Sequence, residues 1–340
     1  MALTQLPDAA ASSPEQPAVV TVANSGRRGS RSRRGGTSGG GRADGLSSRW
    51  SGRRRAGLGG WLLRLALAVV FAFPLLFMFV SSLKPDQQIF GDLSSVAAFL
   101  PIGNISFDNY AAVFDRVPAA RFLINSIGIS AITVLLGILV NSLAAFALSR
   151  MSMRGKSIIL TLIIATLIVP FETLALPLVW WVNQLPSLTL DGFSLGFSKG
   201  WIDTYQVQII PFIANAFSIY LFHQYFESIP KELDEAARMD GAGWFRIYRQ
   251  VVMPLSGPAV ATVAILTFLP AWNSYLWPLM VVQTEELRPV MVGVQYFFQL
   301  NVSWGEVMAY ASLITLPVVA LFIAFQRSFV NSIASSGVKG

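Results

Sequence analysis

Residues 123–149 read LINSIGISAITVLLGILVNSLAAFALS and contain no charged side chain. A helix needs roughly 20 apolar residues to cross the hydrocarbon core of a membrane. This stretch is longer than that, and it ends at Arg150, whose charge favours water. The stretch therefore predicts a transmembrane helix from about Phe122 to Ser149.

Five more stretches of the chain are long and apolar enough to cross a membrane. They are Trp61–Leu83, Ser157–Val182, Gln206–Phe226, Gly257–Val282 and Glu306–Gln326. Only 13% of the residues are charged, whereas soluble proteins have about 25%. The predicted fold class is an all-α membrane protein with six transmembrane helices. Prolines interrupt the fourth and fifth stretches, and transmembrane helices tolerate proline where neighbouring groups satisfy the freed backbone, so we expect these two helices inside a bundle.

Lysine and arginine are distributed unevenly over the predicted loops, and such residues mark the cytoplasmic side. One side has few of them, namely Lys84, Arg116, Arg121, Lys199 and Arg288. The other side has many more, including Arg150, Arg154, Lys156, Lys231, Arg238, Arg246, Arg249, Arg327 and Lys339. We therefore expect both termini to be cytoplasmic, which requires an even number of spans and agrees with six.

Residues 1–56 are rich in Arg, Gly and Ser and poor in apolar side chains. Such a segment cannot bury enough surface to fold, so we predict a disordered, basic cytoplasmic tail that contacts anionic lipid headgroups. The net charge of +7 comes largely from this tail, and we expect no nucleic-acid partner. The apolar stretch that follows is too long for a cleaved signal peptide. Residues 57–340 are predicted to form the transmembrane domain.

The longest predicted cytoplasmic connection, residues 227–256, is polar and has strong helix signals. With two further residues it reads ESIPKELDEAARMDGAGWFRIYRQVVMPLSGP. Ser228 is a candidate N-cap with Pro230 in the first turn, and Gly241 suits a left-handed C-terminal residue. A second short helix is expected from about Trp244 to Val252, ended by Met253-Pro254. The connection is therefore predicted to form two short helices with a bend at Gly241.

The spacing within this connection resembles the signature of ABC-importer permeases, the binding-protein-dependent family. The matching residues are Glu235, Ala236, Ala237, Gly241, Val251, Met253 and Pro254. Val251 and Met253 stand where the family usually has Ile and Leu. Other stretches, among them SSLKP, NISFDNYAAVF, AFALSRMSMRGK, AWNSYLWPL and SGVKG, resemble the second membrane subunit of maltose-type and glycerol-phosphate-type importers. The likeness covers roughly residues 60–340.

This resemblance implies a multi-pass permease of the bacterial inner membrane whose last five helices form the type I importer core. The implied partners are a dimer of ATP-binding subunits, a second homologous permease, an extracytoplasmic substrate-binding protein and membrane lipid. The connection would dock on the ATPase, with Glu235 accepting hydrogen bonds, Ala236 and Ala237 allowing close approach, and Gly241, Met253 and Pro254 shaping the loop. ATP hydrolysis belongs to the partner, so no enzyme activity, catalytic residue or cofactor is expected.

The resemblance also implies a solute, a sugar or oligosaccharide. The alternative is an ABC permease for glycerol 3-phosphate or a related polar solute. A secondary transporter or membrane enzyme would need charged residues in facing helices or a catalytic cluster, and the predicted spans contain few charges. His223 is the single histidine and there is no cysteine, so no metal site is predicted. The segment Arg154–Ser157 resembles the end of a phosphate-binding loop, but Arg150 replaces its first glycine.

Polar residues within apolar helices are candidates for the translocation path. They are Glu172, Asn215, Asn273 and Tyr275. A position at the outer membrane boundary is an equal alternative for Glu172. For the asparagines, the alternative is a hydrogen-bonding contact between helices. Trp272 and Trp277 beside Tyr275 are suited either to stacking on a sugar ring or to packing and interface anchoring.

Overall fold

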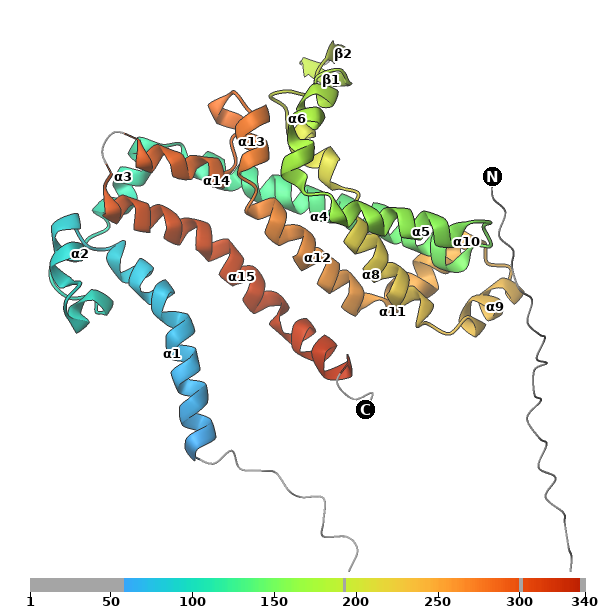
Figure 1. Cartoon of the computed structure of the whole chain (residues 1–340), viewed down its shortest axis with the longest axis horizontal. Coiled ribbons are helices and arrows are strands. Elements are labelled where there is room, and N and C mark those ends of the chain that lie inside the picture. Colours follow the sequence, from blue (N-terminus) through green and yellow to red (C-terminus); the bar gives the residue numbers. More distant parts are fainter. Residues whose placement is uncertain (1–57, 192–193, 300–301, 337–340) are drawn as a thin grey trace, which may run out of the picture. The chain divides into compact units, whose positions relative to one another are not determined.

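The computed structural model describes residues 58–191, 194–299 and 302–336, and the described residues from Gly60 onward form one compact unit. The predicted disordered tail, residues 1–56, lies outside the described part. Helices dominate the unit (Figure 1). The longest are α1 (Leu58–Ser81), α4 (Ala119–Arg150) and α15 (Trp304–Ser336). All three are long and apolar enough to cross a membrane.

Three bent helix pairs are apolar enough to supply further spans, which allows up to six by length and composition. The elements of the first two pairs are α5 (Lys156–Ala165), η2 (Thr166–Ile168), α6 (Phe171–Val182), α7 (Tyr205–Ile209), η3 (Ile210–Phe212) and α8 (Ala216–Glu227). The third pair includes α12 (Gly257–Trp272), which α13 (Leu276–Val281) follows. The chain therefore has the predicted all-α architecture, and the count of six spans remains a prediction.

The stretch Ser157–Val182, predicted as one span, is broken. Its two halves, Lys156–Ile168 and Phe171–Val182, meet at 103°. Pro170 lacks the backbone N–H that a continuing helix needs, and proline moves the preceding residue out of the helical region. Val169 is accordingly extended, with φ −82° and ψ 117°. The sequence indicated a bend at Pro170-Phe171, but it did not predict an angle this sharp.

Helix α4 is the central element, since it packs along both α8 and α12. Buried polar side chains recur along it, at Asn125, Ser126, Ser130, Thr133, Asn141, Ser142 and Ser149. The spacing of Ser126, Ser130, Thr133 and Asn141 places these four along one side of the helix. Several bind irregular segments: Asn125 donates to the carbonyls of Glu286 and Arg288, and Ser126 accepts from the N–H of Val290. The stripe therefore holds segments that cannot satisfy their own backbone.

Short elements connect the longer helices. They are α2 (Asp86–Asp92), η1 (Val96–Phe99), α3 (Asp108–Arg116), η5 (Glu285–Leu287), α14 (Val290–Gly293), η6 (Val294–Phe298) and a hairpin of β1 (Pro186–Asp191) with β2 (Ser194–Lys199). The strands are antiparallel, with Pro186 opposite Lys199. Lys84 of the SSLKP stretch is buried here, and its Nζ lies 2.9 Å from Asp92 Oδ2 and 2.7 Å from the Ala97 carbonyl.

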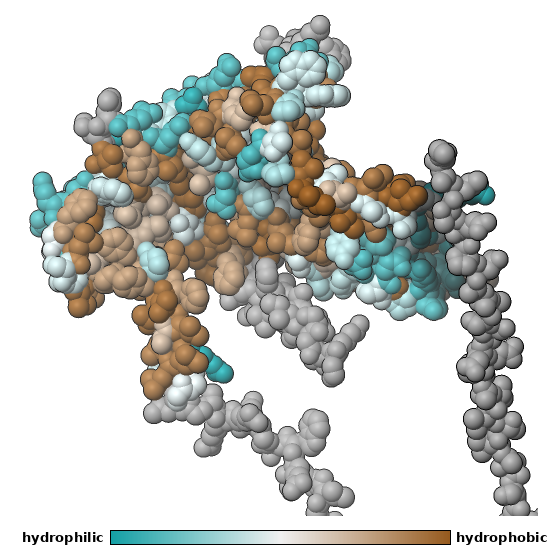
Figure 2. All heavy atoms as spheres, in the orientation of Figure 1, coloured by the Kyte–Doolittle hydropathy of each residue, from teal (hydrophilic) through white to brown (hydrophobic). Residues whose placement is uncertain are grey.

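The polarity of the surface differs from one part of the unit to another. Figure 2 shows hydrophobic atoms over α1 and along the helices, and hydrophilic atoms gathered around α9 and α10. Three buried clusters form the core, and the largest contains Phe146, Phe222, Phe226 and Ile247 at the end that includes α9 and α10. The most apolar window of α1 has no part buried within this chain. That surface needs lipid or another protein to cover it.

Candidate functional site

The predicted surface connection forms α9 (Glu232–Met239), α10 (Trp244–Ile247), a π-helical turn η4 (Tyr248–Val252) and α11 (Met253–Leu255). Two details of the prediction were wrong. Ser228 does not begin α9, because its hydroxyl donates to the Tyr225 carbonyl at the end of α8. Met253-Pro254 does not end the second helix, because Pro254 lies in the first turn of α11, where its missing N–H costs little.

The bend after α9 is a Schellman motif centred on Gly241. The N–H of Ala242 donates to the Ala237 carbonyl at 2.9 Å, and that of Gly241 donates to the Arg238 carbonyl at 3.0 Å. Gly241 has φ +79°, a left-handed conformation that glycine adopts without steric cost. Across the bend, the guanidinium of Arg238 on α9 lies 4.9 Å from the ring centroid of Trp244 on α10. This cation–π contact joins α9 to α10.

The predicted coupling residues differ in exposure. Glu235, Ala236, Gly241 and Pro254 are exposed, whereas Ala237 and Met253 are half-buried and pack against the large core cluster. Sequence analysis missed two apolar side chains on the same surface, Met239 at 88% exposure and Phe245 at 68%. The sequence signal available for this surface was an apolar residue, Met239, close to the bend at Gly241. Exposed apolar groups of this size next to a carboxylate are suited to a protein interface.

A buried ion pair underlies this surface, and sequence analysis did not predict it. Arg150 Nε lies 3.1 Å from Asp234 Oδ2, with side-chain exposures of 1% and 8%. Burial raises the pKa of Asp234, and the charges of Arg150 and Lys231 oppose that increase. Asp234 directly precedes Glu235, so adjacent carboxylates on one helix have opposite environments. No sequence spacing links residue 150 to residue 234.

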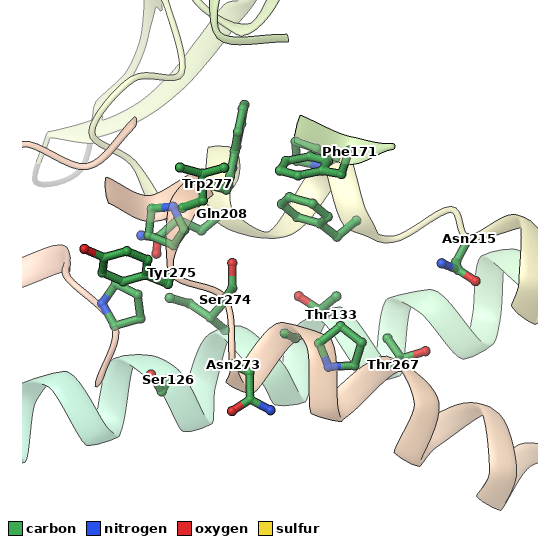
Figure 3. A pocket seen from close by; sticks show the side chains of 18 of the residues that line it. Ser126, Thr133, Phe171, Gln208, Asn215, Thr267, Asn273, Ser274, Tyr275 and Trp277 are labelled. Atoms are coloured by element: carbon green, nitrogen blue, oxygen red, sulfur yellow. The ribbon is translucent and has the colours of Figure 1, made fainter. Parts of the chain in front are cut away.

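A cavity of about 600 Å³ lies between α4, α7, α12 and the segment around Tyr275 (Figure 3). Three of the four predicted path residues line it, namely Asn215, Asn273 and Tyr275. Glu172 is not among the lining residues; it is exposed in the first turn of α6, where a carboxylate favours the helix dipole. Trp272 is fully buried in a core cluster and is therefore unavailable for sugar stacking. Trp277 lines the cavity but is 1% exposed, and its indole N–H donates to the Val207 carbonyl.

The polar groups at the cavity are amides and hydroxyls, and the residues that line it include no charged side chain. Asn215 Oδ1 accepts from the N–H of Ser218 and so caps α8, and Asn273 Nδ2 donates to the Leu269 carbonyl. In contrast, the Thr133 hydroxyl and Gln208 Oε1 are buried and have no hydrogen-bond partner among the described residues. Sequence analysis did not single out either residue. Both are polar atoms that the described chain leaves unpaired in residues at the wall of the cavity.

Within the described ranges, no group of His, Cys, Asp and Glu is arranged to hold a metal ion. The candidate site has two parts, an exposed helical loop and an uncharged cavity, and α4, α8 and α12 join them.

The family model described as "Binding-protein-dependent transport system inner membrane component" matches residues 133–335. The chain belongs to this family. A binding-protein-dependent inner membrane component is a multi-pass transport subunit and not an enzyme, which confirms the family predicted from the loop motif and its neighbours.

Relatives and one solved structure extend the comparison. The arabinooligosaccharides transport system permease protein AraQ of Halalkalibacterium halodurans is 30% identical over 82% of this chain and 96% of its own length. The sn-glycerol-3-phosphate transport system permease protein UgpE of Salmonella choleraesuis is also 30% identical, over 81% and 94%. A crystal structure of a bacterial ABC transporter for import of the acidic polysaccharide alginate contains a chain with TM-score 0.65 and 24% identity, covering 80% of this chain and 95% of that one. That similarity supports the fold of this importer component.

Proposed function

We propose that this inner membrane component is the permease subunit of an ATP-driven importer for a sugar or oligosaccharide. The main support is the cavity, whose lining includes hydroxyl and amide side chains, among them the exposed Asn273 and Tyr275, beside apolar surface. Neutral sugars have hydroxyl groups for such side chains and apolar ring faces for an aromatic residue. The relative that transports arabinooligosaccharides supports the same class of solute.

Glycerol 3-phosphate is the second candidate solute, favoured by the relative UgpE. Phosphate recognition commonly uses Arg or Lys in charge-assisted hydrogen bonds. The described cavity lining has neither. This difference favours a neutral polyol over a phosphate ester for the part of the path that this chain supplies.

We propose that the exposed face of α9 is where ATP-binding subunits dock. Glu235 presents a carboxylate, Ala236 leaves room for a close backbone approach, and Gly241 ends the helix so that Met239 and Phe245 remain exposed. Ala237, Met253 and Pro254 hold the loop in shape, since the first two pack on the core cluster and Pro254 begins α11. A dimer of ATPase subunits would then pull this loop and move the helices as rigid bodies.

The remaining partners follow from the same proposal. The unburied surface of α1 is suited to lipid and to a second, homologous permease subunit that completes the path. A substrate-binding protein delivers the solute at the outer face, where the loops between the helices lie. The Lys and Arg distribution supports cytoplasmic termini, and the proposal takes residues 1–56 as a basic tail and 57–340 as the permease domain.

Uptake by intact cells tests the proposal. A strain lacking this chain is compared with the complemented strain for uptake of radiolabelled arabinotriose, other neutral oligosaccharides and glycerol 3-phosphate. Loss of uptake of one neutral sugar, restored by complementation, supports the proposal. Loss of glycerol 3-phosphate uptake alone would assign the second candidate solute. Unchanged uptake of every neutral sugar would refute the carbohydrate assignment.

A further inference from the structure

Arg150 contacts two elements besides its own helix. It is the last residue of α4, and its Nη2 donates to the carbonyls of Phe226 and Ile229 at 2.8 and 2.9 Å. These carbonyls lie at and just beyond the end of α8, where backbone acceptors have no partner within the helix. A cation at this end also favours the helix dipole. One guanidinium thus joins the ends of α4 and α8.

The same guanidinium reaches α9 through Asp234. The Nε–Oδ2 distance is 3.1 Å, and both side chains are buried. Asp234 lies one residue before Glu235 but points into the unit, whereas Glu235 points outward from it. A load applied to the exposed face of α9 therefore reaches Asp234 over a single residue of the same helix.

Burying this pair has a cost that apolar residues would avoid. Two charges removed from water lose hydration, and well-packed hydrophobic residues of similar volume are often equally or more stable. Arg150 Nε and Nη1 and Asp234 Oδ1 also have no hydrogen-bond partner among the described residues, so the contact is an ion pair only. The large core cluster already packs α8 against this loop, so stability alone is a weak reason for the pair. A specific polar contact is suited to fixing one orientation of α9 relative to α4 and α8.

We propose that the Arg150–Asp234 pair is the positioning link that makes α9 move together with α4 and α8. This inference rests on the proposed docking of ATPase subunits on α9. The nearby pair Lys231–Glu227 also joins the loop to α8, at 3.7 Å, but its side chains are 60% and 36% exposed. An exposed pair of this kind contributes little because water screens it. It is therefore a matched control.

Spin-label distances in the assembled complex test the link. The chain has no cysteine, so Gln224→Cys on α8 and Glu232→Cys on α9 place labels at two exposed sites without competing thiols in this subunit. The complex with its ATPase subunits is placed in lipid nanodiscs and measured without nucleotide and after trapping with ATP and vanadate. We expect one narrow distance, equal in both states, for the parent chain and for Glu227→Gln.

Asp234→Asn is expected to behave differently. Its distance distribution should broaden and change on trapping, and ATPase stimulation by the binding protein should fall about fivefold or more. A variant that merely destabilised the chain would lower the amount of complex and leave the distance narrow. If Asp234→Asn does not assemble, Arg150→Met with Asp234→Leu replaces the pair by apolar side chains and should assemble with the same broad distribution.

The outcomes separate the two proposals. Failure of the parent chain to recover ATPase subunits would refute the docking assignment itself. Recovery of the ATPase together with narrow, state-independent distances in Asp234→Asn, or in the apolar pair if that variant is needed, would refute only the link.

Discussion

The backbone N–H of Asn215 donates to the side-chain Oδ1 of Asn141 at 2.9 Å, across the interface of α4 and α8. Asn141 Nδ2 donates in turn to the carbonyl of Ile213 at 2.9 Å. Asn141 is fully buried, and its side-chain amide satisfies both backbone groups at the break between η3 and α8. The interruption around Pro211 and Asn215 is therefore stabilised from the neighbouring helix, as transmembrane helices with breaks require.

Replacing Asn141 by Leu should destabilise the chain strongly. Two part-buried backbone groups, the Ile213 carbonyl and the Asn215 N–H, would lose this partner, at about 1–3 kcal/mol each. We expect a lower unfolding temperature in detergent and less extractable protein. Asn273→Leu is the control, because Asn273 is exposed and bonds only within α12. Equal unfolding temperatures for Asn141→Leu and the unmodified chain would contradict this role.

Gly293 tests close packing between α14 and α15. A Cβ there would clash with the Tyr310 hydroxyl and lie 2.7 Å from the Phe122 ring. Gly293→Ala would displace Tyr310, whose hydroxyl donates to the Val290 carbonyl at 2.8 Å, and overpacking of this kind costs about 1–3 kcal/mol. Gly128→Ala on α4 meets nothing within 4 Å and should leave the unfolding temperature unchanged or slightly higher. A matching decrease in both variants would point to a general effect of alanine and not to this contact.

Asp203 should make stability depend on pH. Burial favours its neutral form, but hydrogen bonds from Thr284 and Gln283 and the charge of Arg288 outweigh burial and lower its pKa. Because the folded pKa lies below the ordinary 3.8, the stabilisation is complete above that pH and is lost as the pH falls through the lowered value. Thermal unfolding between pH 7 and pH 3 should show this loss, and Asp203→Asn should flatten it.

The backbone at Asp203 allows a second comparison. Its φ of +61° is left-handed, which Asn and Gly tolerate better than Ala. Asp203→Ala should therefore be less stable than Asp203→Gly, although both lose the hydrogen bonds to residues 283 and 284. The reverse order would contradict the assigned conformation.

Glu235→Lys should weaken recovery of ATPase subunits by about tenfold or more in a pull-down from detergent, since a charge-assisted contact becomes a repulsion. Glu232→Lys is the matched control, because Glu232 is exposed on the same helix and is not among the motif residues. Met239→Ser should also reduce recovery without changing the unfolding temperature, because its side chain is 88% exposed. Equal recovery with Glu235→Lys and Glu232→Lys would show that the docking surface lies elsewhere.

Thr133→Val should slow sugar uptake at low concentration several-fold and leave stability unchanged. Thr133 lines the cavity, and its hydroxyl is buried without a described partner, so the folded chain loses no internal hydrogen bond. Ser130→Ala removes another buried, unpartnered hydroxyl of α4 that does not line the cavity. Uptake equal in the two variants would remove Thr133 from the path.

The sequence by itself determined the features that depend on solvent and on local backbone chemistry. Apolar length made Phe122–Ser149 a spanning helix, because unpaired backbone groups cannot remain in hydrocarbon. Gly241 predicted the bend after α9, because a left-handed φ favours glycine. The motif spacing around Glu235 was sufficient to predict the family that the comparisons show.

Only the tertiary structure decided which distant residues meet. Asn141 and Asn215 are 74 residues apart, and Arg150 contacts Asp234 although no local periodicity relates them. The same holds for the cavity, which includes Asn273 and Tyr275 but leaves Glu172 outside and Trp272 in the core. A polar side chain in an apolar helix has the same local pattern whether it caps a broken neighbour, pairs with a buried charge or lines a path. Its role depends on which helix packs against it, and that is a property of the assembled bundle.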